Sequence, residues 1–198
     1  MLVASKNENF LEQNIDWEFP VPIAYGPGRL SEIGLFCEQF QISNPLIITD
    51  EGSKNLPFIN RLITLLQEAS IPSKLFFGIS PNPRDDEIMA GCETYRSGKH
   101  DSIIAIGGGS AMDGAKAIGM TVNSGVNLWD FEYRKPSPKI GSKNCFPTFI
   151  TVPTTAGTGA ETESTAMITD TKQGMKFCLA HLGTVSYTHL TLPTNGLV

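Results

Sequence analysis

The segment that most limits the fold of this chain is a short apolar run that ends in three glycines. Residues 103–106 have the composition of a strand that is buried on both faces. Gly107, Gly108 and Gly109 follow at once, and without Cβ atoms their backbone can approach a ligand closely. Apolar residues then recur at helical spacing, at Ala111, Ala115, Ile118 and Val122. The sequence therefore predicts a buried strand, a tight glycine turn and a helix.

This glycine turn is expected to bind an anion. The first amides of a helix have no partner inside the helix, and the helix dipole favours negative charge at that end. We therefore expect Gly107, Gly108 and Gly109 to hold a phosphate or pyrophosphate, with Ser110 adding a hydroxyl donor or capping the helix. The alternative is a turn that needs glycine for its geometry alone, but three glycines in a row favour the phosphate site.

Strand and helix patterns alternate along the chain from residue 45. The segments expected to form strands are 46–49, 75–77, 102–106, 146–152, 168–170 and 176–179. Helical faces follow the first three of these strands, and a turn at Gln173-Gly174 separates the last two. This alternation favours an α/β fold with a doubly wound, Rossmann-like parallel sheet.

Composition excludes several classes of protein. The net charge is −5, which disfavours nucleic acid as a partner. The apolar runs are far too short to span a membrane, and no export signal begins the chain, so a cytoplasmic protein is expected. The four cysteines are scattered and are expected to stay reduced. His100 is expected on the surface.

Three further features are candidates for ligand contacts. Asp50 ends a predicted strand, where a carboxylate suits a ribose diol and repels an extra phosphate, which points to NAD rather than NADP; it could equally cap a helix or lie in a solvated loop. Asp113, expected in the first turn of the glycine-loop helix, and Lys116 lie near the cofactor or form an exposed pair. The segment 153–161 offers hydroxyls and amides, although its composition also suits any polar loop.

Taken in order, these motifs resemble the iron-containing alcohol dehydrogenase family over about residues 17–180. They are GGGSxxDxxK from Gly107 to Lys116, PTTAGTGAE from Pro153, and the shorter YGPG, TD, PNP and ITD segments that begin at Tyr25, Thr49, Pro81 and Ile168. Any one of these motifs is weak evidence, but the ordered set is specific.

The resemblance implies a fold, a chemistry and a site. The fold is the dehydroquinate synthase-like N-terminal domain, which holds NAD against an all-helical C-terminal domain. That second domain carries Fe(II) or zinc on one Asp and three His, and the metal polarises the oxygen of a small alcohol or carbonyl substrate during hydride transfer. The full-length form is expected to be a homo-oligomer. The implied cofactor residues are Asp50, Asn82, Gly107, Gly108, Gly109, Ser110, Thr154, Thr155, Thr158 and Lys176.

The sequence also departs from the family. Glu163 stands where many members carry a threonine, and the family pattern stops near Ala180. We expect a flexible leader over residues 1–16, a dinucleotide-binding domain over 17–180, and a non-family tail over 181–198. The tail resembles adapter read-through, so we expect a truncated reading frame that lacks the helical domain and has no catalytic residues of its own.

No metal ligands are expected in this chain, because His181 and His189 lie in a tail with no acidic neighbour. The chain alone is therefore expected to be inactive. The alternatives are a glycerol dehydrogenase-like or dehydroquinate synthase-like relative, against which Ser110 and the threonine segment argue, and a non-catalytic nucleotide-binding module.

Overall fold

The computed structural model describes residues 15–18, 22–140, 145–181 and 188–190. Most of the expected leader and of the expected tail therefore lies outside the described residues, but the leader was expected to reach residue 16, whereas Ile15 and Asp16 belong to the strand β1. In chain order the elements are β1 (Ile15–Glu18), β2 (Pro22–Tyr25), η2 (Arg29–Glu32), α1 (Ile33–Gln39), β3 (Pro45–Asp50), α2 (Pro57–Glu68), β4 (Lys74–Ile79), α3 (Asp85–Ser97), β5 (Ser102–Gly107), α4 (Gly109–Val122), η3 (Leu128–Phe131), β6 (Thr148–Pro153), β7 (Thr165–Asp170), β8 (Met175–Ala180) and β9 (Thr188–Leu190).

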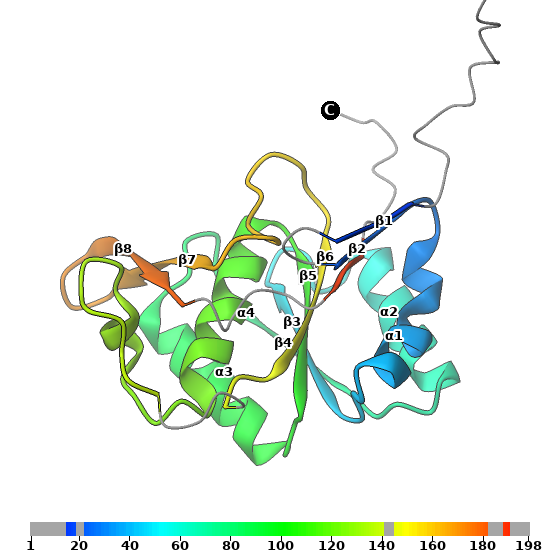
Figure 1. Cartoon of the computed structure of the whole chain (residues 1–198), viewed down its shortest axis with the longest axis horizontal. Coiled ribbons are helices and arrows are strands. Elements are labelled where there is room, and N and C mark those ends of the chain that lie inside the picture. Colours follow the sequence, from blue (N-terminus) through cyan, green and yellow to red (C-terminus); the bar gives the residue numbers. More distant parts are fainter. Residues whose placement is uncertain (1–14, 19–21, 141–144, 182–187, 191–198) are drawn as a thin grey trace, which may run out of the picture.

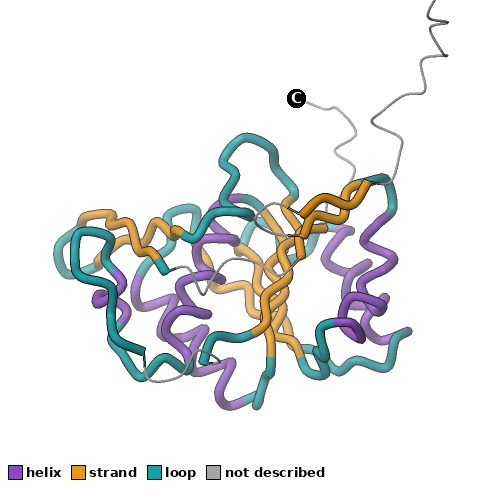
Figure 2. The backbone as a smooth tube through the Cα atoms, in the orientation of Figure 1, coloured by secondary structure: helices purple, strands orange, loops and turns teal. Residues whose placement is uncertain are grey.

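A parallel sheet forms the centre of the molecule, with helices on both of its faces (Figures 1 and 2). The strands lie in the order β1-β2-β9-β6-β5-β3-β4, and β1 alone runs antiparallel, against β2. The predicted doubly wound α/β fold is confirmed. The short strands β1, β2 and β9 were not among the strands predicted from the sequence.

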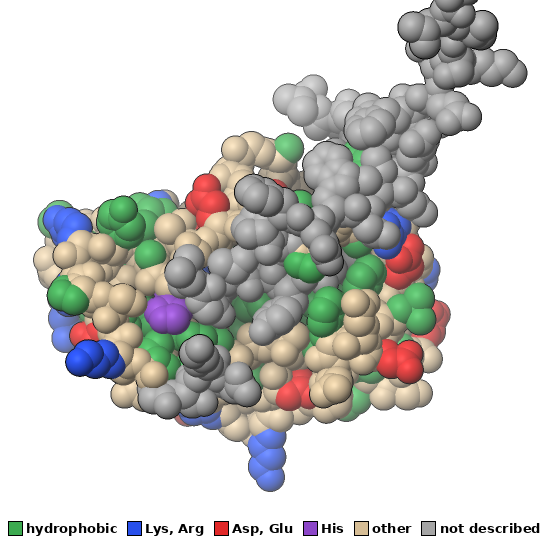
Figure 3. All heavy atoms as spheres, in the orientation of Figure 1, with side chains coloured by type: hydrophobic (Ala, Val, Ile, Leu, Met, Phe, Trp, Pro, Cys, Tyr) green, Lys and Arg blue, Asp and Glu red, His purple; other side chains and the backbone are tan. Residues whose placement is uncertain are grey.

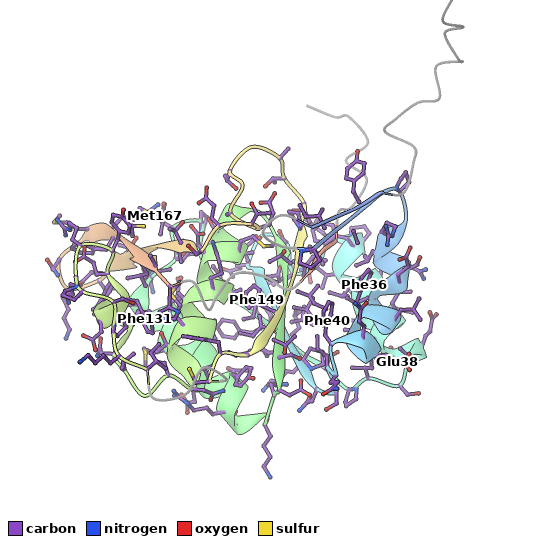
Figure 4. All side chains as sticks on the ribbon, viewed as in Figure 1. Phe36, Glu38, Phe40, Phe131, Phe149 and Met167 are labelled. Atoms are coloured by element: carbon purple, nitrogen blue, oxygen red, sulfur yellow. The ribbon has the colours of Figure 1, made fainter. Side chains whose placement is uncertain are left out.

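The sheet separates two hydrophobic cores, because successive side chains of a strand point to opposite faces. Ile103 and Ala105 of β5 pack with α3 and α4, whereas Ile104 and Ile106 pack with α1 and α2. All four residues are fully buried, and each isoleucine stabilises the fold by about 1.5–3 kcal/mol on burial. Figure 4 shows Phe149 on the α4 side of the sheet, and Phe36 and Phe40 on the α1 side.

The direction in which the chain winds reverses between β3 and β5. From β3 the chain continues to β4 on one side, and from β5 it continues to β6 on the other. In open parallel sheets, ligands bind outside the carboxyl ends of the strands at such a switch point. The glycine turn, which follows β5, and Asp50, which ends β3, both lie here.

A hairpin of β7 and β8 packs against α4 on the side away from the sheet (Figure 1). The two strands pair from Thr165 with Ala180 to Asp170 with Met175, which confirms the predicted strands on either side of Gln173-Gly174. Because α4 is covered by the sheet and by this hairpin, eleven of its fourteen residues are buried. It is the central helix of the fold.

The expected surface position of His100 is wrong. The side chain is buried, and its Nδ1 lies 3.0 Å from the carbonyl oxygen of Asn44. Because a carbonyl accepts only, Nδ1 carries the proton. His100 thus ties the start of β5 to the start of β3.

On the outer surface, positive and negative side chains are interspersed over the face shown in Figure 3. Among the described residues, no helix has the length and apolar content that a membrane crossing requires.

Candidate functional site

The glycine turn is built as the sequence predicted. Gly107 ends β5 with φ +147°, and α4 begins at Gly109 with Gly108 as its N-cap. The first hydrogen bond of the helix runs from the amide of Met112 to the carbonyl of Gly108, at 3.1 Å. The amides of Gly109, Ser110 and Ala111 therefore have no partner within the helix, and the positive end of the dipole lies there.

The threonine segment covers this turn. The amide of Thr154 donates to the carbonyl of Gly107 at 2.9 Å, which joins the ends of β5 and β6. A Cβ at Gly108 would lie 3.4 Å from Oγ1 of Thr155, and one at Gly109 would lie 3.3 Å from Oγ1 of Thr158. Both threonines are exposed. The fold thus brings the glycine turn and the threonine segment together. Because Gly108 and Gly109 have no side chains, a space remains between the two segments.

Ser110 does not cap the helix, so that part of the sequence interpretation is wrong. The N-cap is Gly108, which makes no side-chain cap, because the helix begins before the serine. Instead, Oγ of Ser110 donates to the carbonyl of Pro81 at 2.7 Å. This bond ties the loop after β4 to the start of α4.

Asn82 and Lys176 meet at the same loop. Nζ of Lys176, on β8, donates to Oδ1 of Asn82 at 2.7 Å. Asn82 directly follows Pro81, whose carbonyl accepts the hydroxyl of Ser110, so the loop that Lys176 contacts is also bonded to the start of α4. Both side chains are exposed and remain accessible to a ligand.

Asp50 lies on the other side of the glycine turn. Its carboxylate accepts the amide of Ser53 at 2.9 Å and the hydroxyl of Ser53 at 2.8 Å. It does not cap α2, whose N-cap is Leu56. The carboxylate is half-buried, and Oδ2 is 3.1 Å from the position that a Cβ on Gly107 would take.

Asp113 and Lys116 form an ion pair, with Nζ 3.5 Å from Oδ1, but the pair is not exposed. Lys116 has no exposed surface, and Nζ donates to the carbonyls of Glu163, at 3.3 Å, and Thr165. Asp113 lies beyond the first turn of α4, which contains no acidic residue. The expectations of a first-turn carboxylate and of an exposed pair are both wrong.

Burial dominates the electrostatics of this pair. It raises the pKa of Asp113, and the opposite charge of Lys116 counteracts the rise. Burial likewise lowers the pKa of Lys116, against the attraction of Asp113 and of Glu163 and Glu161.

Other residues near the turn were missed by sequence reasoning. Thr49, directly before Asp50, is fully buried, and its Oγ1 has no hydrogen-bond partner in the part of the chain that the structure describes. Ser53, which orients Asp50, lies in a loop with no motif to mark it. The side chain of Glu163 accepts the hydroxyl of Thr165 at 3.0 Å and is exposed.

Several hollows of the surface lie away from this site. One of about 610 Å³ is formed by α3, the loop at residues 125–129 and the hairpin turn, and one of about 540 Å³ lies between α1 and α2. Neither includes the glycine turn or Asp50.

A model of the family described as iron-containing alcohol dehydrogenase matches residues 20–191. The chain belongs to the iron-containing alcohol dehydrogenase family. The match runs past Ala180. The expected boundary at residue 180, between a dinucleotide-binding domain and a non-family tail, stays a prediction.

Relatives in this family are named for several alcohols. A choline dehydrogenase of Bacillus subtilis is 34% identical over 176 residues, which cover 89% of this chain and 43% of the relative. An NAD-dependent methanol dehydrogenase of Bacillus methanolicus is 30% identical, over 79% of this chain and 40% of the relative. An NADPH-dependent butanol dehydrogenase of Clostridium saccharobutylicum is 31% identical, over 81% of this chain and 40% of the relative. The chain spans about two fifths of the length of these relatives.

Solved structures show the same fold. A sulfoacetaldehyde reductase of Bifidobacterium kashiwanohense in complex with NAD+ superposes with a TM-score of 0.78 at 27% identity, over 92% of this chain and 46% of that one. A 1,3-propanediol oxidoreductase gives a TM-score of 0.79 at 25% identity, with the same coverage.

The described residues do not fit the metal that the family name implies. No group of three or more His, Cys, Asp or Glu among residues 15–18, 22–140, 145–181 and 188–190 is arranged to hold an ion. The ring of His181 packs instead against the rings of Phe146 and Phe131, with centroids 4.6 Å and 5.7 Å away. Burial lowers the pKa of His181.

Proposed function

We propose that this chain is the cofactor-binding part of an NAD-dependent alcohol dehydrogenase that interconverts a small alcohol with an aldehyde or ketone. The observation that carries the proposal is the glycine turn at the switch point of the sheet. There the first amides of α4 and the carboxylate of Asp50 lie at the carboxyl ends of β5 and β3, and Lys176 bonds to Asn82 in the loop after β4. Family membership supports the reaction class.

The residues present fit NAD, which supplies the hydride chemistry when it is bound. Gly107, Gly108 and Gly109 would receive the pyrophosphate at the start of α4, where amide groups and the helix dipole favour an anion. Thr154, Thr155 and Thr158 would contact the same cofactor from the loop above. Ser110 and Asn82 would shape its edge, and Lys176 would add a positive charge.

Asp50 would select the cofactor. Its carboxylate would accept the hydroxyls of the ribose and would repel the additional phosphate of NADP. Members of the family differ in this respect, since relatives are named as NAD-dependent and as NADPH-dependent. Asp50 is therefore the residue on which we base the choice of NAD.

The whole enzyme would need parts that the described residues do not provide. We propose that a helical domain supplies the metal, Fe(II) or zinc, and most contacts to the substrate, and that the complete protein is a homo-oligomer. On this basis residues 17–180 form the dinucleotide-binding domain. The chain by itself should then bind cofactor with negligible turnover of simple alcohols.

The test is a calorimetric titration of NAD and of NADP into the 198-residue chain. We expect NAD to bind more tightly than NADP, and we expect Asp50→Ser to reduce or reverse that preference. Gly109→Val, which places a bulky side chain against Thr158, should abolish binding. Absence of NAD binding by a folded chain, or a preference for NADP, would contradict the proposal.

Adding a separately produced helical domain of a relative tests the alternative, a non-catalytic nucleotide-binding module. Dehydrogenase activity of the mixture supports an enzyme part. Tight NAD binding that the helical domain neither strengthens nor converts into turnover supports the module.

A further inference from the structure

We propose that Lys116, together with Asp113, positions the loop at residues 154–162 over the glycine turn and does not itself contact the cofactor. This inference rests on the proposed function for its link to NAD. It assigns a positioning role to two residues that sequence analysis expected at the cofactor.

Lys116 and Asp113 bond to backbone groups that lie just after the loop. Lys116 donates to the carbonyls of Glu163 and Thr165, and Oδ2 of Asp113 accepts the amide of Met167 at 3.2 Å. These three backbone groups lie at alternate positions of one segment, which directly follows the loop. One turn of α4 therefore fixes the end of the loop.

The beginning of the loop is fixed to the glycine turn that leads into α4. The amide of Thr154 donates to the carbonyl of Gly107, and α4 starts two residues later, at Gly109. The loop thus spans two anchors that belong to a single turn and helix. Between the anchors it holds Thr155 beside Gly108 and Thr158 beside Gly109, the two positions where a pyrophosphate would bind.

The burial of Lys116 excludes direct contact with a ligand. The Lys116 side chain has no exposed surface, and its ammonium has three protons for three acceptors, the carboxylate of Asp113 and two carbonyls. A buried ammonium is tolerated only with such partners. The side chain is therefore fully used within the protein.

The experiment compares Lys116→Met with wild type in the full chain by hydrogen exchange, without cofactor, and by NAD titration. Methionine keeps the apolar stem and removes the charge. We expect faster amide exchange in residues 154–162, unchanged exchange in β3, and an NAD Kd that rises about three- to thirtyfold. Lys74→Met, which removes an exposed lysine at the start of β4, should change none of these.

Asp113→Asn is the second variant, in case Lys116→Met does not fold. It removes the charge that pairs with Lys116 but keeps a side-chain oxygen that can accept the amide of Met167, so we expect the same changes at smaller size. If folded variants exchange the loop amides at the wild-type rate, or lose stability with unchanged loop exchange and Kd, the positioning role is wrong. If wild type binds no NAD, the proposed function fails, while the exchange data still decide whether Lys116 fixes the loop.

Discussion

The carboxylate of Asp50 lies against the α-carbon of Gly107, so that a methyl group on Gly107 would be 3.1 Å from Oδ2. The same methyl group would be 2.8 Å from Cβ of Ala111, and Gly107 has φ +147°. Because β3 and β5 are adjacent, the acid that we expect to bind ribose and the turn that we expect to bind pyrophosphate share one boundary. Glycine at position 107 is required by both sterics and backbone conformation.

The variant Gly107→Ala should therefore be destabilised, by about 1–3 kcal/mol, because it combines a strained backbone with a close contact. It should also bind NAD more weakly, since the turn must shift. Urea denaturation measures the first effect and calorimetry the second.

Gly119→Ala is the matched control for this substitution. Gly119, in α4, is buried like Gly107, but the nearest atoms to an added Cβ lie at 3.6 Å. Alanine favours the helix over glycine by about 1 kcal/mol, so this variant should be as stable as wild type or more stable. Equal stability of the two variants would show that the geometry at Gly107 is not restrictive.

Local patterns were sufficient to predict most of the fold. The strands β3 and β5 have apolar side chains on both faces, and β5 ends at the first of three glycines. Their composition and the glycines that end β5 are therefore enough to identify them. The identity of the sheet neighbours was not predictable from such patterns. The strand β9, with three residues, pairs with β2 and β6 and carries no periodic signal of its own.

Two of the errors, the exposed Asp113–Lys116 pair and the surface position of His100, have one physical cause, which is contact between segments distant in sequence. Asp113 and Lys116 have the spacing of a surface pair, but the β7–β8 hairpin covers that face of α4. His100 looks like a surface residue until the carbonyl of Asn44 is brought beside it. Hydrogen bonds such as that of Ser110 to Pro81 depend on the assembled fold.

Lys176→Met should weaken NAD binding by about three- to tenfold, because an exposed ammonium beside a pyrophosphate contributes about 1 kcal/mol in water. The salt dependence of the affinity should also decrease. Stability should hardly change, since the bond to Asn82 lies on the surface. Lys172→Met, in the nearby hairpin turn, is the control, and an equal loss of affinity there would indicate a general charge effect.

Thr49→Val should leave the free energy of unfolding unchanged or raise it by about 1 kcal/mol. The hydroxyl of Thr49 is buried without a partner among the described residues, and a methyl group of the same shape requires no hydrogen bond. Urea denaturation of the variant decides the matter. A loss of more than about 1 kcal/mol would mean that the hydroxyl has a partner, such as a buried water.

Asp101→Asn should lower stability at pH 7 in a way that disappears in acid. The carboxylate accepts hydrogen bonds from the amide of Ser43 at 2.8 Å, from the hydroxyl of Ser43 at 2.7 Å, from the amide of Asn44 at 3.1 Å and from the hydroxyl of Ser102 at 2.6 Å. Burial favours the neutral form, but these hydrogen bonds outweigh it and lower the pKa of Asp101 below the usual 3.8.

A carboxyl group whose pKa is lower in the folded state stabilises the protein above its unfolded pKa and loses that contribution as the pH falls through the folded value. The difference between wild type and Asp101→Asn should therefore be about 1 kcal/mol at pH 7, as expected for a partly exposed group, and should shrink below about pH 4. Urea denaturation of both proteins between pH 7 and pH 3 measures this difference. A difference that stays constant with pH would show that asparagine disturbs packing, and that the charge of Asp101 contributes nothing.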